Sequence, residues 1–131
     1  MRMVMAESVE RTFRSKIWTK GTASRIVAVR RASEVAVATA FGLEPKALKI
    51  ATRGPARAAF ARQTAMYLAH VGCGLSLTEV GRAFGRDRTT VAHACGVVED
   101  RRDEAEFDRM LTHLENAVTA LIEALAPGRE A

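Results

Sequence analysis

Apolar residues recur every three to four positions in several stretches of the chain, and this spacing predicts amphipathic helices. Weaker patterns predict a helix over 25–41, a short helical turn near Pro45 and a second long helix over 55–72. The strongest pattern, which we interpret as core rather than a dimer seam, is the stripe of Phe107, Met110, Leu111, Leu114, Val118, Leu121, Ile122 and Leu125 within a last helix over 103–126. No segment alternates as a strand does, so the expected fold is all-α.

Two helices joined by a tight turn are predicted after the second long helix. Ser76 and Glu79 have the spacing of a capping box, in which each side chain satisfies a free backbone N–H group at a helix start. This predicts a short helix over 76–84. Gly85 is suited to end that helix, and the next one begins within the following residues.

The helix after Gly85 begins with polar residues, whereas its later turns have an apolar face. Val91 and the residues three, four and seven positions later are apolar, so they share an inner face, while Thr89 and His93 point outward. A short helix, a tight turn and a second helix are typical of a helix-turn-helix. In that motif the start of the second helix reaches base edges in the major groove. On periodicity alone, a buried helical hairpin without a DNA-binding role is the alternative.

The side chains at this helix start have the chemistry of base recognition. Arginine can donate two hydrogen bonds to guanine, threonine can pack its methyl group on thymine, and aspartate can accept from a cytosine amino group. Charge supports the same interpretation, because residues 1–102 hold 18 Lys and Arg against 8 Asp and Glu, whereas 103–131 hold 2 against 7. A basic body indicates nucleic acid first, and an acidic partner or anionic membrane second.

Several separated blocks of the sequence resemble the C-terminal DNA-binding domain (domain IV) of the bacterial replication initiator DnaA. The blocks are RQTAMYLAH, LSLTEVGRAFG and RDRTTVAHAC, preceded by the similar region FGLEPKALKIATRG. The resemblance covers about residues 24–125. It implies a multi-helix, Trp-repressor-like domain with a helix-turn-helix and a long C-terminal helix, which binds the DnaA box in origins and some promoters.

Site residues follow from the resemblance by position. The base-reading residues it implies are Asp87, Arg88, Thr89 and Thr90 in the major groove and Arg53 as a minor-groove arm. The DNA-backbone contacts it implies are Arg57 (also the second candidate for the minor-groove arm), Arg62, Gln63, Ser76, Leu77, Thr78, Arg86 and His93. No catalytic residue, cofactor or metal ligand is implied.

Three features depart from the family pattern. Gly85 stands alone before the Arg-Asp pair, where the family usually has two small residues, so the turn is one residue tighter. Arg88 replaces the usual histidine, which predicts a changed base preference. Gly96 and Val97 stand where the family often has a basic pair, which predicts fewer phosphate contacts.

The sequence contains no G-x-x-x-x-G-K-[ST] phosphate-binding loop. We therefore expect a DNA-binding domain without the initiator's ATPase, acting as a stand-alone DnaA-related regulator of the HdaB type. The expected organisation is a basic N-terminal arm over 1–23, the helix-turn-helix domain over 24–126 and a tail over 127–131. Val9, Phe13 and Ile17 have helical spacing, so the arm either folds back onto the domain or binds a partner.

The predicted function is sequence-specific binding of DnaA-box-like duplex DNA by a regulator of chromosomal replication initiation. One alternative is a protein-interaction regulator with weak DNA reading, which controls the activity or inactivation of the initiator. Another is a helix-turn-helix transcription regulator. The expected partners are double-stranded DNA and, in the first alternative, DnaA or its inactivating factor. A monomer is favoured, and neither a membrane nor a small-molecule substrate is expected.

Further functions are disfavoured by the remaining chemistry. Cys73 and Cys95 imply no disulfide framework, which suits a reducing compartment. His93 and Cys95 lie two positions apart on a helix and face different sides, so we expect no zinc site. With no signal peptide and no run of apolar residues that spans a bilayer, the expected location is the cytoplasm, on the nucleoid. We expect no enzymatic activity.

Overall fold

The computed structural model describes residues 22–49 and 56–125, and helices account for most of both ranges. The elements are α2 (Thr22–Phe41), the 3-10 helix η1 (Pro45–Lys49), α3 (Ala56–Tyr67), the π-helix η2 (Leu68–Gly72), α4 (Leu77–Phe84), α5 (Arg88–Arg101) and α6 (Ala105–Leu125). No strand occurs within the two described ranges, and the predicted all-α fold is confirmed. The predictions for residues 1–21 of the N-terminal arm, for Arg53 and for the tail lie outside these ranges. The last two residues of the predicted arm, 22 and 23, belong to α2, which begins earlier than expected.

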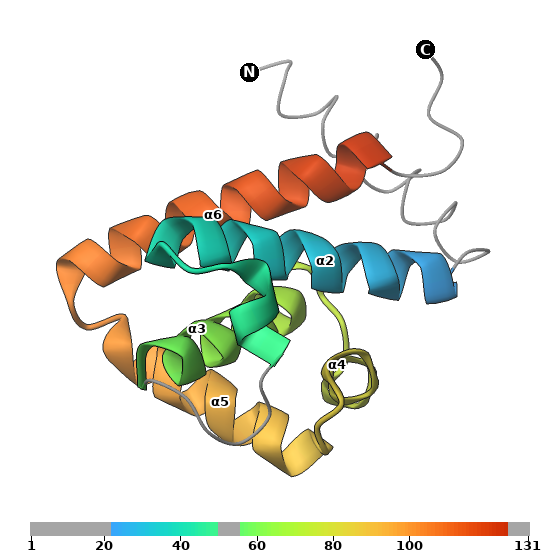
Figure 1. The fold of residues 1–131 in the computed structure, drawn as a ribbon, viewed down its shortest axis with the longest axis horizontal. Helices are drawn as coiled ribbons and strands as arrows, with labels where there is room; N and C mark the ends of the chain where they lie inside the picture. Colours follow the sequence, from blue (N-terminus) through green and yellow to red (C-terminus); the bar gives the residue numbers. More distant parts are fainter. Residues whose placement is uncertain (1–21, 50–55, 126–131) are drawn as a thin grey trace.

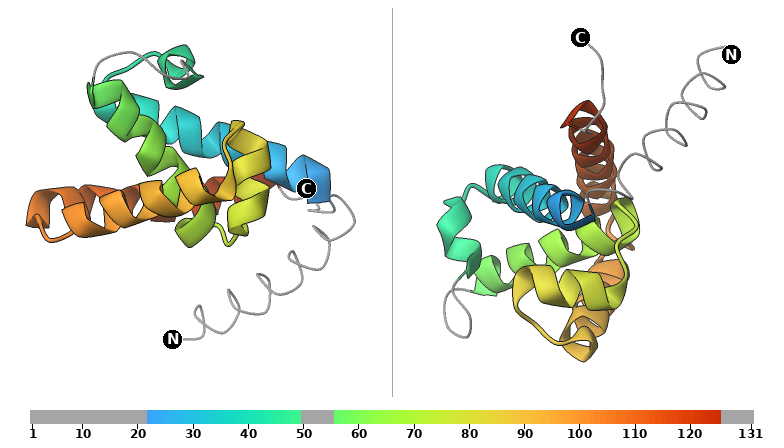
Figure 2. Two further views of the ribbon diagram at one scale, coloured as in Figure 1. Left: turned by 90° about the horizontal axis from the view of Figure 1, so that it is seen from below. Right: turned by 90° about the vertical axis from the view of Figure 1, so that its right-hand side faces the viewer.

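The helices pack around a core shared by α2, α3, α5 and α6. Figure 1 shows α2 and α6 side by side, with α3 and α5 below them and α4 at the right. Contacts join α3 to α5, α2 to both α3 and α6, and α4 to α5. In Figure 1, α4 therefore lies at one side of the domain, whereas the C-terminal end of α5 leads into the start of α6. Figure 2 shows the same arrangement from two further sides.

Small side chains make up much of the buried face of α3 and η2. Ala61 and Ala65 of α3 and Leu68 and Ala69 of η2 are all fully buried. Alanine side chains let neighbouring helices approach closely, and larger groups fill the space between them. Tyr67, at the end of α3, is the largest fully buried side chain in the described ranges.

The second long helix differs from the prediction at its end. After Tyr67 it widens into the π-helical turn η2, in which the N–H group of Cys73 donates to the carbonyl of Leu68 at 3.0 Å. Arg25 of α2 donates to the carbonyl of Cys73 at 2.6 Å, so a carbonyl left over at the helix end has a partner. The helix thus changes type where α2 contacts its end.

The apolar stripe of α6 is core over only part of its length. Leu111, Val118 and Ile122 are buried, whereas Leu121 is 45% exposed and Leu125 58% exposed. The stripe is wider than the face that α2 and η2 cover, because neighbouring positions such as 121 and 122 point about 100° apart around a helix. The core prediction is therefore wrong for these two leucines within the described part of the chain.

Two further observations bear on function classes. No helix in the described ranges is long and apolar enough to cross a membrane. Nor do three or more His, Cys, Asp or Glu side chains gather there in a way that could hold a metal ion.

Both cysteines are free thiols, and burial raises the pKa of Cys73 to about 11.

Candidate nucleic-acid interface

A helix-turn-helix is formed by α4 and α5, and the start of α4 has the predicted capping box. The Ser76 hydroxyl accepts from the backbone N–H group of Glu79 at 3.0 Å. The Glu79 carboxylate accepts from the backbone N–H group of Ser76 at 2.9 Å. Ser76, one of the residues expected to contact the DNA backbone, is thus also the N-cap of α4.

The turn between the two helices passes directly over α4. Gly85 ends α4 in the left-handed conformation with φ of +69°, and the N–H group of Arg86 donates to the carbonyl of Gly81 at 2.9 Å. A Cβ atom on Gly81 would lie 2.5 Å from the carbonyl oxygen of Arg86. Gly81 is therefore required for the close approach. The sequence prediction missed it, although a glycine inside a short helix is a known signal of close packing.

Asp87 is the N-cap of α5. Its carboxylate accepts from the backbone N–H group of Thr90 at 2.8 Å. The pKa of Asp87 is lowered although the side chain is fully exposed. The largest cause is the hydrogen bond from the Thr90 backbone, and smaller ones are those from the Thr90 hydroxyl and the Thr89 backbone. Asp87 thus holds the start of the helix whose polar end is expected to read bases. Its contact with a base stays a prediction.

The cap at Asp87 predicts a pH dependence. Because the folded pKa is lowered, the cap stabilises the fold above the unfolded pKa of about 3.9, and this contribution is lost as the pH falls through the folded pKa. In a carboxyl-carbon NMR titration, we expect the midpoint of Asp87 to lie below the ordinary aspartate value of about 3.9. The amide resonance of Thr90 should shift with the same midpoint. A midpoint for Asp87 at or above the ordinary value would contradict the cap.

The predicted orientation of α5 is confirmed. Val91, Ala94 and Val98 are buried and Cys95 is half-buried, so this face packs on the core. Arg88, Thr89, Thr90 and His93 are exposed. The helix therefore presents polar side chains to solvent at its N-terminal end while its apolar face fixes it to the domain.

A second group of predicted residues lies together beside the turn. The pKa of Arg62 on α3 is lowered, mainly by burial and to a smaller extent by the positive charge of nearby Arg86. Two arginines from different elements therefore lie close enough to act on one another. Like charges held together are suited to an anion such as a DNA phosphate.

A hollow of about 350 Å³ beside the turn is lined by Thr78, Gly81, Arg82, Gly85, Arg86, Asp87 and Arg88. Arg82 is exposed in the last turn of α4 and was not among the expected contacts. The sequence analysis did not identify Arg82 as a DNA contact, because the apolar periodicity of so short a helix does not show which polar residues lie beside the turn. Three arginines from α4, the turn and α5 thus line one hollow.

The other predicted backbone contacts are only partly gathered here. Gln63 and Leu77 are half-buried, and Thr78 is exposed at the start of α4. Arg57 turns its guanidinium toward the end of α2, where its Nε atom donates to the carbonyl of Phe41 at 2.9 Å and one terminal nitrogen donates to the same oxygen. The DNA contacts expected of these residues stay predictions.

A polar cluster at the opposite end of α5 fixes the direction of that helix. Arg102 donates to Asp108 at 2.5 Å and to Glu115 at 3.1 Å, both on α6, and to the hydroxyl of Tyr67 at 2.9 Å. That hydroxyl donates to Glu99 of α5 at 2.8 Å. Burial opposes the charge on Arg102, but the hydrogen bonds that it donates to Asp108, Tyr67 and Glu115 outweigh this effect and raise the pKa of the guanidinium.

The fold and the exposed polar helix start define a helix-turn-helix domain of the kind that binds DNA. Residues 34–98 match the family described as bacterial dnaA protein helix-turn-helix. The helix-turn-helix part of the chain is therefore homologous to domain IV of the replication initiator DnaA, and the fold is that of this domain.

Individual relatives agree with this assignment. The chain is 46% identical over 68 residues to the chromosomal replication initiator protein DnaA of Bordetella pertussis, covering 50% of this chain and 14% of that protein. It is 48% identical over 59 residues to the DnaA protein of Aquifex aeolicus, covering 44% and 14%. The chain thus aligns with only a small part of each relative.

A solved structure extends the similarity beyond the helix-turn-helix. A crystal structure described as a DNA replication initiation factor is 25% identical and superposes with a TM-score of 0.68. The similar region covers 92% of this chain and 37% of that one. The likeness therefore extends over nearly the whole of this chain.

Proposed function

We propose that this domain binds double-stranded DNA at DnaA-box-like sites and regulates the initiation of chromosomal replication. In this proposal the start of α5 enters the major groove, where Arg88, Thr89 and Thr90 contact bases. Asp87 holds the helix start and contributes to the same surface. The role is one of binding, with no catalytic step.

The observation that carries the proposal is the pairing of a buried inner face with an exposed polar start in α5. Val91 and Val98 are fully buried, so the helix cannot rotate to hide Arg88 and Thr89. Arg62 and Arg86, which lie close together beside the turn, supply positive charge for the phosphate backbone. Phosphate contacts set the position of a protein on the duplex, and base contacts set its specificity.

We further propose that the domain acts without an ATPase of its own, as a stand-alone DnaA-related regulator of the HdaB type that works on the nucleoid. The unit formed by α2 to α6 has its own core and both helices of the motif, which supports DNA binding by this domain. Such a regulator would occupy origin sites that the initiator also binds. We therefore expect that adding ATP leaves the affinity of the protein for a box duplex unchanged.

The variant Arg88→Ala/Thr89→Ala tests the base-reading surface. We expect this double variant to lose most of its preference between a DnaA-box duplex and duplexes with single base changes, because each good base contact contributes about 1–3 kcal/mol of discrimination. Fluorescence anisotropy with the panel of duplexes measures the effect. Binding to a scrambled duplex should change much less than binding to the box.

A matched control is Arg109→Ala, which removes an exposed positive charge from α6. It should leave discrimination intact, because the start of α6 follows the C-terminal end of α5, about 20 Å along that helix from Arg88. If the double variant discriminates between sites as well as the unchanged protein does, the assignment of base reading to α5 is wrong.

A second candidate function is that of an interaction protein that controls the initiator or its inactivating factor. One observation favours it. Gly96 is exposed with open space around its Cα atom, and Val97 is half-buried, so neither position supplies a cation for DNA. Capture of purified DnaA by the immobilised chain in the absence of DNA would distinguish this function from DNA binding alone.

A further inference from the structure

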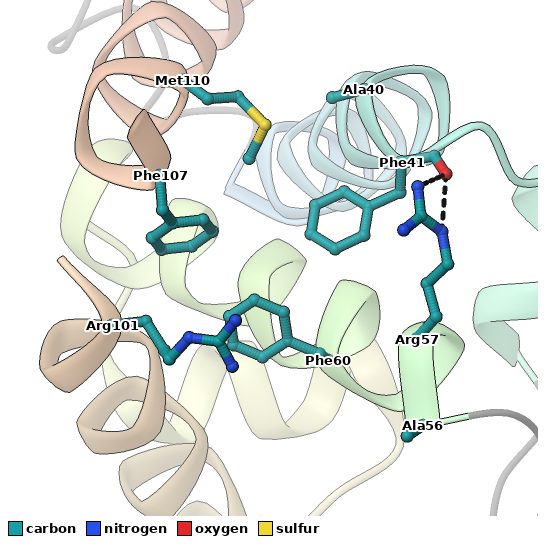
Figure 3. Close-up of a pocket in the computed structure, with 8 residues that line it drawn as sticks. All are labelled: Ala40, Phe41, Ala56, Arg57, Phe60, Arg101, Phe107 and Met110. Carbon is teal, nitrogen blue, oxygen red and sulfur yellow. Dashed lines mark hydrogen bonds between the residues drawn. The ribbon is translucent and has the colours of Figure 1, made fainter. Parts of the chain in front are cut away.

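A second hollow, of about 420 Å³, lies where the ends of four helices meet. The end of α2, the start of α3, the end of α5 and the start of α6 each contribute side chains, as Figure 3 shows. This volume is within the range of about 300–1,000 Å³ that is usual for pockets that hold small ligands. None of the residues expected to read bases in the major groove lines it, and Arg57 is the one expected DNA contact among its lining residues.

The floor of the hollow is aromatic. The Phe60 ring lies between Phe41, with ring centroids 6.0 Å apart, and Phe107, with centroids 5.3 Å apart. Both ring pairs are tilted, and the Met110 side chain completes the wall beside Ala40 (Figure 3). Tilted aromatic pairs and a methionine make a preformed but adaptable apolar site for a large apolar side chain.

The rim of the hollow is positively charged. Arg101 stacks its guanidinium over Phe60, 4.6 Å from the ring centroid, and Arg57 lies 5.5 Å from the centroid of Phe41. No acidic residue lines the hollow. The ion pair of Arg101 with Glu104 spans 3.4 Å between two side chains that are at least half exposed, so it contributes little and can be exchanged for another carboxylate.

The position of the hollow separates it from the proposed DNA surface. Arg101 ends α5, whereas Arg88 begins it, so the two sites lie about 20 Å apart along the helix at 1.5 Å per residue. Bases inside a duplex are stacked and cannot enter an apolar hollow without being flipped out. A segment of another protein fits better, because it can supply an apolar side chain and carboxylates at the same time.

We propose that this hollow is a docking site for an acidic segment of a protein partner. One large apolar side chain of the segment inserts between Phe41, Phe107 and Met110, and its flanking carboxylates pair with Arg101 and Arg57. The domain could then hold the partner and DNA together. Because Arg57 is also an expected DNA contact, the variants that test the hollow leave it unchanged.

The test uses the ¹⁵N-labelled full chain and a short synthetic peptide of aspartates and glutamates around one central phenylalanine. In NMR titrations we expect saturable shifts at the residues that line the hollow. Ala40→Glu places a negative charge in the wall and should weaken peptide binding about tenfold or more, because like charges at an interface are strongly unfavourable. Val35→Glu is the matched control, at another exposed position of α2, and should bind as the unchanged protein does.

Three outcomes would overturn the proposal. One is equal binding of a peptide with alanine in place of the phenylalanine, because charge alone would then explain the shifts. Another is a set of shifts centred on the helix-turn-helix instead of the hollow. The third is displacement of the peptide by a short single-stranded oligonucleotide that shifts the same lining residues, which would make the hollow a nucleic-acid site. Affinity of Ala40→Glu for a box duplex, measured separately, should remain unchanged.

Discussion

Replacing Gly81 by alanine is expected to cause a large loss of both stability and DNA binding. The added Cβ atom would lie 2.5 Å from the carbonyl oxygen of Arg86, a backbone atom that cannot move without moving the turn. Overpacking of this kind costs about 1–3 kcal/mol. After the gain of about 1 kcal/mol that alanine normally brings over glycine in a helix, we expect a net loss of up to about 2 kcal/mol, because the clash is with backbone. Thermal unfolding and anisotropy with a box duplex measure the two losses.

The same substitution at Gly96 is the matched control. A Cβ atom there meets nothing within 4 Å, and the position lies inside α5. Gly96→Ala should therefore raise the free energy of unfolding by about 0.4–1 kcal/mol and leave DNA binding unchanged. If Gly81→Ala stabilised the protein as Gly96→Ala does, the close approach of the turn to α4 would be refuted.

The second large effect is expected for Arg102→Met. Methionine retains much of the aliphatic length but removes hydrogen bonds to Asp108, Glu115 and Tyr67. Hydrogen bonds to charged groups contribute about 1.5–3 kcal/mol each, and partial exposure of the cluster reduces their sum. We expect a loss of about 2 kcal/mol, which lowers Tm by roughly 10 °C in a domain of this size.

Arg101→Met is the control for the polar cluster. Arg101 is the preceding residue, and its exposed ion pair with Glu104 and its contact with the Phe60 ring should together contribute about 1 kcal/mol. Chemical denaturation of both variants compares them directly. Equal stability losses would mean that the cluster around Arg102 does not join α5 to α3 and α6.

The sequence predicted the helices well where a local signal was strong. The capping box at Ser76, the stop at Gly85 and the inner face of α5 all depend on residues within one or two turns of each other. The π-helical turn after Tyr67 and the exposure of Leu121 could not be predicted in this way. Both depend on where a distant helix, α2, reaches along its neighbours.

The candidate site was predicted in its composition more than in its geometry. Arg88 and Thr89 are exposed at a helix start as the periodicity implied. The closeness of Arg62 to Arg86 needs the packing of α3 against the turn, which periodicity does not give. The roles of Gly81 and Arg102 likewise arise from contacts between elements. The base and phosphate contacts themselves stay predictions.

Base reading by α5 is tested most directly by anisotropy with a DnaA-box duplex and a scrambled duplex of the same length, each at low and high salt. We expect a preference for the box that persists at high salt, because contacts to base edges do not depend on release of counterions as phosphate contacts do. Equal affinity for both duplexes, lost together as salt rises, would contradict it. Phosphate electrostatics alone would then explain binding, and α5 would not read a sequence.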